Sequence, residues 1–348
     1  MAESFAMNGG DGPFSYVRNS DMQRRAADAA KALLVEQIVE NLEMGNAAPS
    51  VFTIADMGCS TGPNTFSAVD TIIEAVTKKY EIEGQSNHLP EFQVAFNDRV
   101  SNDFNTLFAN LPSDKKYYAA GVPGSFHGRL FPKASLSFVY SAIALHWLSE
   151  APQEIGDLGS PACNRGRFFY DNAPKQIVEA YFSKFAKDME FFLRARAEEV
   201  TAGGLMAILI SGCPSGTLPS QCSPGLLLRP LESCLLDMAN EGIISNDKVD
   251  SFNLPLYCPS IDELTTLIQN NGCFSVLRME MLPNRSNDLS LLSTEMCRAA
   301  FENLIRGHFG GEIIEQLFQR YTMKIVGHPL PRTSETAGIM FVLLKRKA

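Results

Sequence analysis

The sequence predicts an α/β protein with a doubly wound, mostly parallel sheet, and three observations support this class. Short apolar runs alternate with helical patterns over the first 212 residues, as in sheets whose strands are joined by crossover helices. The apolar run 51–54 leads into an acidic residue and a glycine-containing turn, and a helical pattern follows at once. The last apolar run, 338–344, follows a helical stretch and is expected to close the sheet as an antiparallel strand. We therefore expect a Rossmann-like sheet of seven strands with an inserted helical subdomain.

The elements before residue 212 set up this sheet. A helix is expected from about 21 to 43 because its apolar residues fall on one face, and Ser20 with Gln23 forms a capping-box pattern at its start. A long helix near 176–199 precedes the last strand of this part of the chain. Parallel strands need right-handed crossovers, so helices should cover both faces. Strands are expected near 51–57, 91–97, 117–121, 135–144 and 204–211.

The pattern changes at the Gly-Cys-Pro-Ser-Gly segment 212–216. One strand is expected near 274–281, and the rest of this region is expected to form helices near 226–243, 260–271, 293–309 and 311–321. We expect residues 213–322 to form a mainly helical subdomain that caps the substrate. Residues 1–212 with 323–348 should form the core, and segment 1–44 should close over the site.

Composition excludes several classes of protein. The net charge of -9 and the lack of a basic stripe argue against a nucleic acid as partner. The eight cysteines include no C-x-x-C pair, so zinc is not expected, and we expect them to be reduced and largely buried. The chain shows no signal peptide and no apolar stretch long enough to span a bilayer. We therefore expect a cytoplasmic protein with no membrane contact.

The turn 58–62 (Gly-Cys-Ser-Thr-Gly) narrows the choice of ligand. It lacks the G-x-G-x-x-G spacing of dinucleotide-binding sheets. It matches the G-x-S-x-G nucleophile elbow of hydrolases, with Ser60 as nucleophile, but it follows the first strand and no histidine lies in an obvious loop after a late strand. The third class is the methyltransferases that use S-adenosyl-L-methionine (SAM), in which an acidic residue after the second strand accepts hydrogen bonds from the ribose. Asp98 stands at that position, and the alternative is a turn residue that closes the strand.

Nine short segments extend over nearly the whole chain, at 7–12, 15–16, 19–20, 56–64, 96–98, 102–105, 121–132, 145–149 and 250–255. Together, and in this order, they resemble the plant carboxyl and purine-N methyltransferases often called the SABATH family, which includes salicylate, benzoate and theobromine-type enzymes. The overall similarity leans toward the loganic and farnesoic acid members rather than the salicylate members, which usually carry methionine where His146 stands.

The resemblance implies a site for SAM. Asp98 is expected to bind the ribose, Phe126 to lie near the adenine, and Asn64 or the adjacent backbone to contact the methionine end. Arg99 stands where the family usually has leucine, and its aliphatic stem is expected to cover the adenine while the guanidinium reaches water. The full set of SAM contacts that the resemblance implies is Tyr16, Cys59, Asn64, Asp98, Arg99, Ser125 and Phe126.

The resemblance also implies an acceptor site formed by Gln23, Ile143, His146 and Trp147. Trp147 is the only tryptophan, and its indole N–H suits one carboxylate oxygen, while the Gln23 amide suits the other. The structural alternatives are a helix cap for Gln23, a core aromatic for Trp147 and a structural histidine for His146. Ile143 stands where the family often has an aromatic residue, which suggests a more aliphatic acid or a roomier pocket.

Some family members bind Mg²⁺ near positions that match Asn164, Asp250, the Phe252 backbone and Asn253. Hard oxygen ligands suit such a cation, although Asp-x-x-Asn before Leu-Pro is also an ordinary turn. A bound Mg²⁺ is expected to be structural, and a homodimer is expected.

The function predicted on this basis is methyl transfer to the carboxylate of a small plant acid. A carboxylate is already ionised at neutral pH, so the protein needs no general base, only correct positioning. Two alternatives remain open: N-methylation of a xanthine-type purine, with His146 on a ring atom, and a protein that binds a small acid without turning it over.

Overall fold

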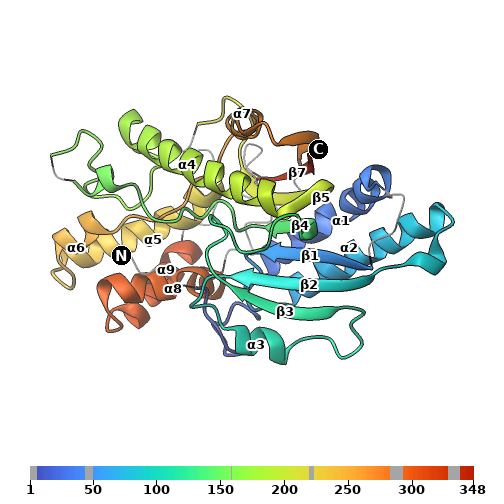
Figure 1. Cartoon of the computed structure of the whole chain (residues 1–348). Helices are drawn as coiled ribbons and strands as arrows, with labels where there is room; N and C mark the ends of the chain where they lie inside the picture. Colours follow the sequence, from blue (N-terminus) through green and yellow to red (C-terminus); the bar gives the residue numbers. More distant parts are fainter. Residues whose placement is uncertain (1–5, 44–49, 158, 219–222, 283–292, 328–337) are drawn as a thin grey trace.

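The computed structural model describes residues 6–43, 50–157, 159–218, 223–282, 293–327 and 338–348. Within these residues the chain forms a seven-stranded sheet with helices on both faces (Figure 1). The strands are β1 (Val51–Met57), β2 (Glu91–Asp98), β3 (Tyr118–Pro123), β4 (Leu136–Ala142), β5 (Val200–Gly212), β6 (Phe274–Met281) and β7 (Gly338–Arg346).

The strand order is β3-β2-β1-β4-β5-β7-β6. The neighbouring pairs from β3 to β5 are parallel, and β7 lies antiparallel between β5 and β6. The order reverses at β1, which lies between β2 and β4, and such switch points are where open α/β sheets bind ligands. The predicted fold class, including the antiparallel final strand, is confirmed.

The helices connect the strands and build the cap region. The first part of the chain contains α1 (Asp21–Asn41), α2 (Pro63–Ile82), α3 (Phe104–Ala109), α4 (Lys175–Glu199) and two short 3-10 turns at Ser86–His88 and Gln153–Ile155. The second part contains α5 (Ser223–Asn240), α6 (Asn246–Ser251), α7 (Ile261–Asn271), α8 (Thr294–Phe309) and α9 (Ile314–Gly327).

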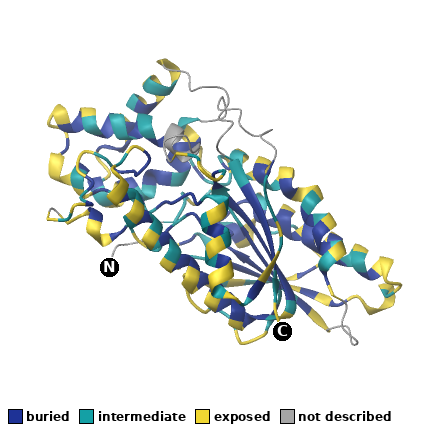
Figure 2. Ribbon diagram, turned by 90° about the horizontal axis from the view of Figure 1, so that it is seen from above, coloured by how far each residue is buried: buried dark blue, intermediate teal, exposed yellow. Residues whose placement is uncertain are grey.

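Alternate residues along the strands pack into two cores, one on each face of the sheet. In β5, Leu205 and Leu209 pack with α1 and α2, whereas Met206 and Ile210 face the core that contains α4 and the cap helices. This period of two follows from the pleat of a strand that is covered on both faces. The burial colours in Figure 2 show the central strands as largely buried ribbons.

The structure corrects two local predictions. Ser20 is the N-cap of α1, but its side chain makes no capping hydrogen bond to the described backbone, so the predicted capping box with Gln23 is wrong there. A capping box does form at α7, where Ser260 and Glu263 bond reciprocally. The short helix α6 was not predicted, because six residues are too few to show a helical period.

Cys213 is disulfide-bonded, so the expectation that all thiols are reduced is wrong at this residue. The other described cysteines are free. Among the described residues no helix is long and apolar enough to cross a membrane. The division into core and cap stays a prediction, and α9 continues across its boundary at 322.

Candidate active site

A cavity lies at the carboxyl ends of β1, β2 and β4, and we call it the inner cavity. Ser60 follows β1, Asp98 ends β2 and Ile143 follows β4, so the sheet alone brings these three residues together. The start of α1 and part of α8 complete the walls. Eight of the predicted residues line it: Tyr16, Gln23, Asp98, Arg99, Phe126, Ile143, His146 and Trp147.

The turn after β1 approaches the neighbouring strands closely because Gly58 has no side chain. Gly58 has φ +88°, and a Cβ built there would lie 2.4 Å from the Cβ of Ala144. The N–H groups of Gly58 and Cys59 both donate to Asn97 O, at 2.8 and 3.0 Å. Any other residue at position 58 would push the turn away from the ends of β2 and β4, so this glycine fixes one wall of the cavity.

Ser60 lies in the same turn with φ +51°, a conformation that is uncommon for residues with a Cβ. Its backbone N–H donates to Asp98 Oδ2 at 2.7 Å, and its carbonyl accepts from Asn102 Nδ2 at 3.0 Å. The hydroxyls of Ser60 and Thr61 are buried and have no hydrogen-bond partner in the described part of the chain. Since no described base contacts the Ser60 hydroxyl, the hydrolase alternative is not supported. Ser60 lines the inner cavity, so its hydroxyl is available to a ligand there, whereas Thr61 is fully buried outside the lining.

Asp98 presents its carboxylate to the cavity wall in a fixed orientation. Oδ2 accepts the Ser60 N–H and Oδ1 accepts the Arg99 N–H, each at 2.7 Å. Burial raises the pKa of this carboxyl, although both N–H donors and the Arg99 charge act in the opposite direction. Each oxygen has a lone pair beyond its backbone partner, so the carboxylate can accept hydrogen bonds from a diol.

A second carboxyl, Asp56, lies buried beneath the turn and was not among the predicted site residues. The Thr65 hydroxyl donates to it. Burial raises its pKa to about 7, with a smaller contribution from the charge of Asp98, while the Thr65 hydrogen bond lowers it. Burial together with the charges of Asp98 and Asp56 also raises the pKa of the Tyr16 phenol, so this hydroxyl stays protonated.

The N-terminal segment is held over the cavity by hydrogen bonds at several points. Asn64 Nδ2 donates to Ser20 O at 3.1 Å and to Ser20 Oγ at 3.0 Å, which attaches the start of α1 to α2. Tyr16 N donates to Asn8 O at 2.8 Å, and Asn8 N donates to Ala299 O of α8 at 3.0 Å. Asn64 therefore does not line the cavity, but it positions the segment that carries Tyr16 and Gln23.

Two further predicted SAM residues lie outside the cavity lining. The Cys59 side chain is buried, and its thiol contacts Ser60 O at 3.5 Å. Ser125 is exposed, and its hydroxyl accepts the His127 N–H at 3.4 Å. Phe126, which follows Ser125 in the chain, is buried and lines the cavity. Contact of these residues with SAM stays a prediction.

The acceptor end of the cavity combines hydrogen-bonding side chains with an apolar wall. Gln23 Oε1 and His146 Nδ1 are buried and lack hydrogen-bond partners among the residues that the structure describes. Burial lowers the pKa of His146 to about 4, so this imidazole is neutral at pH 7. The Trp147 ring lies 6.1 Å from the His146 ring and 5.8 Å from the Phe301 ring, measured between centroids. A neutral, dry pocket of this kind favours a ligand whose polar group is hydrogen-bonded at one end.

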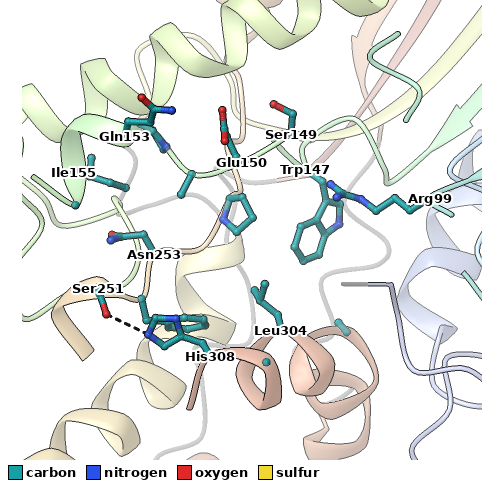
Figure 3. A pocket seen from close by; sticks show the side chains of 17 residues that line it. Arg99, Trp147, Ser149, Glu150, Gln153, Ile155, Ser251, Asn253, Leu304 and His308 are labelled. Carbon is teal, nitrogen blue, oxygen red and sulfur yellow. Dashed lines mark hydrogen bonds between the residues drawn. The ribbon is translucent and has the colours of Figure 1, made fainter. Parts of the chain in front are cut away.

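Arg99 and Trp147 also line a second cavity of about 460 Å³, which we call the outer cavity. Figure 3 shows these two side chains at one end of it, with Ile155 and Gln153 at the other. The Arg99 guanidinium donates to Leu148 O at 3.4 Å, and its burial lowers its pKa. Arg99 is partly exposed and lines both cavities, and the expectation that its stem covers the adenine while its guanidinium reaches water stays a prediction.

The sequence did not indicate several residues of the inner cavity. Asn102 lies beside Asp98 within a segment that the resemblance covers, but it was not assigned a role. The α8 residues could not be placed, because a helical period shows which face is apolar but not what that face meets. The unassigned residues that line the cavity are Ala6, Met7, Met22, Gly58, Ser60, Asn102, Ala144, Ser211, Leu256, Met296, Ala300 and Phe301.

The residues predicted to bind a cation come together in space. Asn164 Nδ2 donates to Asn253 Oδ1 at 2.9 Å, and Gly166 N donates to Asp250 Oδ1 at 2.8 Å. Asn164 is fully buried, and its Oδ1 has no hydrogen-bond partner in the described ranges. The same ranges hold no group of three or more His, Cys, Asp or Glu side chains suited to a metal. The predicted set contains a single carboxylate, and its donors are oxygens of the type that hard cations prefer.

Comparison with known proteins identifies the family of this chain. Residues 2–347 match the model of a family described as SAM dependent carboxyl methyltransferase. Loganic acid O-methyltransferase from Catharanthus roseus is 44% identical over 355 residues, with 99% of this chain and 95% of that protein covered. Farnesoic acid carboxyl-O-methyltransferase from Arabidopsis thaliana is 37% identical, with both chains covered completely. A solved structure of loganic acid methyltransferase with SAH has a TM-score of 0.92 at 43% identity, covering 98% of this chain and 99% of that one. The chain therefore belongs to the SAM-dependent carboxyl methyltransferase family, as the motifs of its sequence predicted.

Proposed function

We propose that this protein transfers a methyl group from SAM to the carboxylate of a small plant acid and releases the methyl ester. The observation that carries the proposal is a single cavity that joins Asp98, at the end of β2, to the hydrogen-bonding side chains Gln23 and Trp147. The family membership and the names of the relatives, which act on loganic and farnesoic acids, support the same reaction class.

The unpartnered Ser60 hydroxyl and the open lone pairs of Asp98 fit SAM at the sheet side of the cavity. Asp98 would accept the ribose hydroxyls, Phe126 would lie against the adenine, and the Ser60 hydroxyl would face the methionine end. When bound, SAM supplies an electrophilic methyl group on a sulfonium. Cys59, Asn64 and Ser125 would support this region from outside the lining.

The residues on the acceptor side need only hold the acid and exclude water. Gln23 and Trp147 would each donate to one carboxylate oxygen, which fixes the direction of the attacking lone pair. Because the acid is ionised at neutral pH, no side chain has to remove a proton. His146 is neutral in this pocket and cannot act as a counter-charge, so it is assigned a packing or hydrogen-bonding role. Orientation of this kind is worth roughly 7–11 kcal/mol in well-aligned systems.

The second candidate function, purine N-methylation, also has a physical basis, because the neutral imidazole of His146 could hydrogen-bond a ring atom. A transfer assay with isotope-labelled SAM separates the two functions. The panel should contain terpenoid, aromatic and hormone acids, their amides as uncharged matches, and xanthines. We expect ester formation from at least one acid and none from its amide. Robust methylation of a xanthine, with no acid accepted, would overturn the proposal.

We further propose that Asn164, Asp250, Asn253 and the Phe252 carbonyl hold Mg²⁺ in a structural role. The unpartnered, fully buried Oδ1 of Asn164 supports this proposal. Added Mg²⁺ should raise the melting temperature of the wild-type protein but not that of Asp250→Ala. A homodimer is proposed on the family resemblance alone, and sedimentation velocity tests it.

A further inference from the structure

One face of α8 lines both cavities. Met296, Ala300, Leu304 and His308 are spaced four residues apart, so their side chains follow one another along a single stripe of the helix. Met296 lines the inner cavity, Leu304 and His308 line the outer cavity, and Ala300 lines both. The smallest side chain of the stripe therefore stands at the junction of the two spaces.

The opposite side of the junction is formed by Trp147 and Arg99, which also line both cavities. Arg99 makes no ion pair with any described residue, and the contact of its guanidinium with Leu148 O is long, at 3.4 Å. Most of its N–H donors thus remain available at the junction. In Figure 3 Leu304 projects from the helix toward the cavity, Trp147 lies beside it, and Arg99 lies beyond Trp147.

The outer cavity is mixed in character. Ile155, Phe252 and Leu304 supply apolar surface, whereas Gln153 supplies an amide. At about 460 Å³ it is large enough for a substantial organic group. The lining of the inner cavity is different, because it contains the side chains proposed to hold the acid's carboxylate and the turn after β1.

We propose that the outer cavity is a second acceptor subsite that takes the distal part of an elongated acid whose carboxylate is held by Gln23 and Trp147. The occupant is a mainly apolar chain or ring system with a neutral hydrogen-bond acceptor near the Arg99 guanidinium. The eight residue steps from Met296 to Leu304 correspond to roughly 12 Å of helix, so acids that extend about this far from the carboxylate reach the outer cavity. Short aromatic acids occupy the inner cavity alone. This inference rests on the proposed function and names its substrate class.

The test is a series of acids that share one head group and carry tails of increasing length. Leu304→Trp fills the outer cavity without touching the inner one, and Leu304→Ala enlarges it. Leu89→Trp is the matched control, because Leu89 is exposed and lines neither cavity. Leu304→Trp should lower kcat/KM for the longest acid by roughly tenfold or more, the scale of steric discrimination in an apolar pocket, and leave the shortest acid unchanged. Leu304→Ala should shift the preference toward longer or bulkier tails.

Equal effects of Leu304→Trp on short and long acids, or no effect on either, would overturn the subsite. The subsite would also be overturned if Leu304→Ala left the preference for tail length unchanged. This second variant keeps the test decisive if Leu304→Trp fails to fold. Titration calorimetry with SAM should give the wild-type dissociation constant for both variants. Failure of the wild-type protein to methylate any acid would instead contradict the proposed function, so the two failures are distinguishable.

Discussion

The Arg196 guanidinium and the Glu199 carboxylate form an ion pair that is completely shielded from solvent at the end of α4. Arg196 also donates to Phe126 O at 2.8 Å and to Gly128 O at 2.9 Å. Glu199 Oε1 accepts the N–H groups of Leu130 and Phe131, at 2.6 and 2.9 Å. The two side chains thus bind four backbone groups of the loop that carries Phe126 into the inner cavity.

Glu199→Gln should destabilise the fold, because it leaves the buried Arg196 charge without its counter-charge. Loss of one partner from a buried pair costs roughly 3–5 kcal/mol. Glu198→Gln is the matched control, since the neighbouring Glu198–Arg129 pair is about half exposed and should contribute at most about 1 kcal/mol. Urea unfolding of both variants measures the difference. Equal midpoints for the two variants would show that the buried pair does not stabilise the loop.

Asp56→Asn should change how stability depends on pH. The folded pKa of Asp56 is about 7, well above the ordinary value of 3.8, so the folded protein binds more protons than the unfolded chain between these values. Stability from this group therefore falls as pH rises from about 4 to about 7. His146 acts in the opposite direction, because its folded pKa of about 4 makes stability fall as pH drops below 6.5.

The difference in unfolding free energy between the wild-type protein and Asp56→Asn isolates the Asp56 contribution, because His146 is common to both. As pH rises from 4 to 7, the unfolding free energy of the wild-type protein should fall relative to that of Asp56→Asn. A flat difference would show that Asp56 is ionised in the folded state at pH 5.

Asp98→Ala should weaken SAM binding far more than binding of the acid. Hydrogen bonds to a charged group are worth about 1.5–3 kcal/mol, so the dissociation constant for SAM should rise by one to two orders of magnitude, roughly. Glu91→Ala at the exposed opposite end of β2 is the control. Calorimetric titration of the folded variant measures the change, and an unaltered SAM affinity would remove Asp98 from the site.

The sequence predicted the sheet well because strand identity depends on local signals. The apolar run at β1 ends at Gly58, and this turn marks the carboxyl end of the sheet whatever the cap does. Asp98 was predicted from its place after the second strand, whereas Trp147 was predicted from the family resemblance. The predictions that failed concern contacts between residues far apart in the sequence. Ser20 looks like a cap in isolation, but its hydroxyl accepts from Asn64, which lies 44 positions away.

The stripe of α8 side chains shows the same limit of prediction from sequence. Its four-residue spacing is visible in the sequence, but nothing local shows that Ala300 lines the same two cavities as Trp147. Likewise, the position of the Arg99 guanidinium depends on Leu148 O, which β4 brings to the end of β2.

Trp147→Phe tests the acceptor chemistry directly. The change keeps an aromatic ring beside His146 and Phe301 and removes only the indole N–H, which would leave one carboxylate oxygen unpaired in a dry pocket. The expected cost is roughly 1–3 kcal/mol in kcat/KM for the acid, with SAM affinity unchanged. Tyr118→Phe, on the exposed edge strand, is the control.

For the wild-type protein, kcat/KM should fall as pH drops through the acid's own pKa, near 4–5 for simple carboxyls, because only the ionised acid binds between Gln23 and Trp147. His146 becomes charged only near pH 4, so this histidine does not account for a loss of rate between pH 5 and 7. The methyl ester, which lacks one anionic oxygen, should compete poorly. A rate that is independent of pH down to 4, together with full activity of Trp147→Phe, would show that the acceptor is held by other groups.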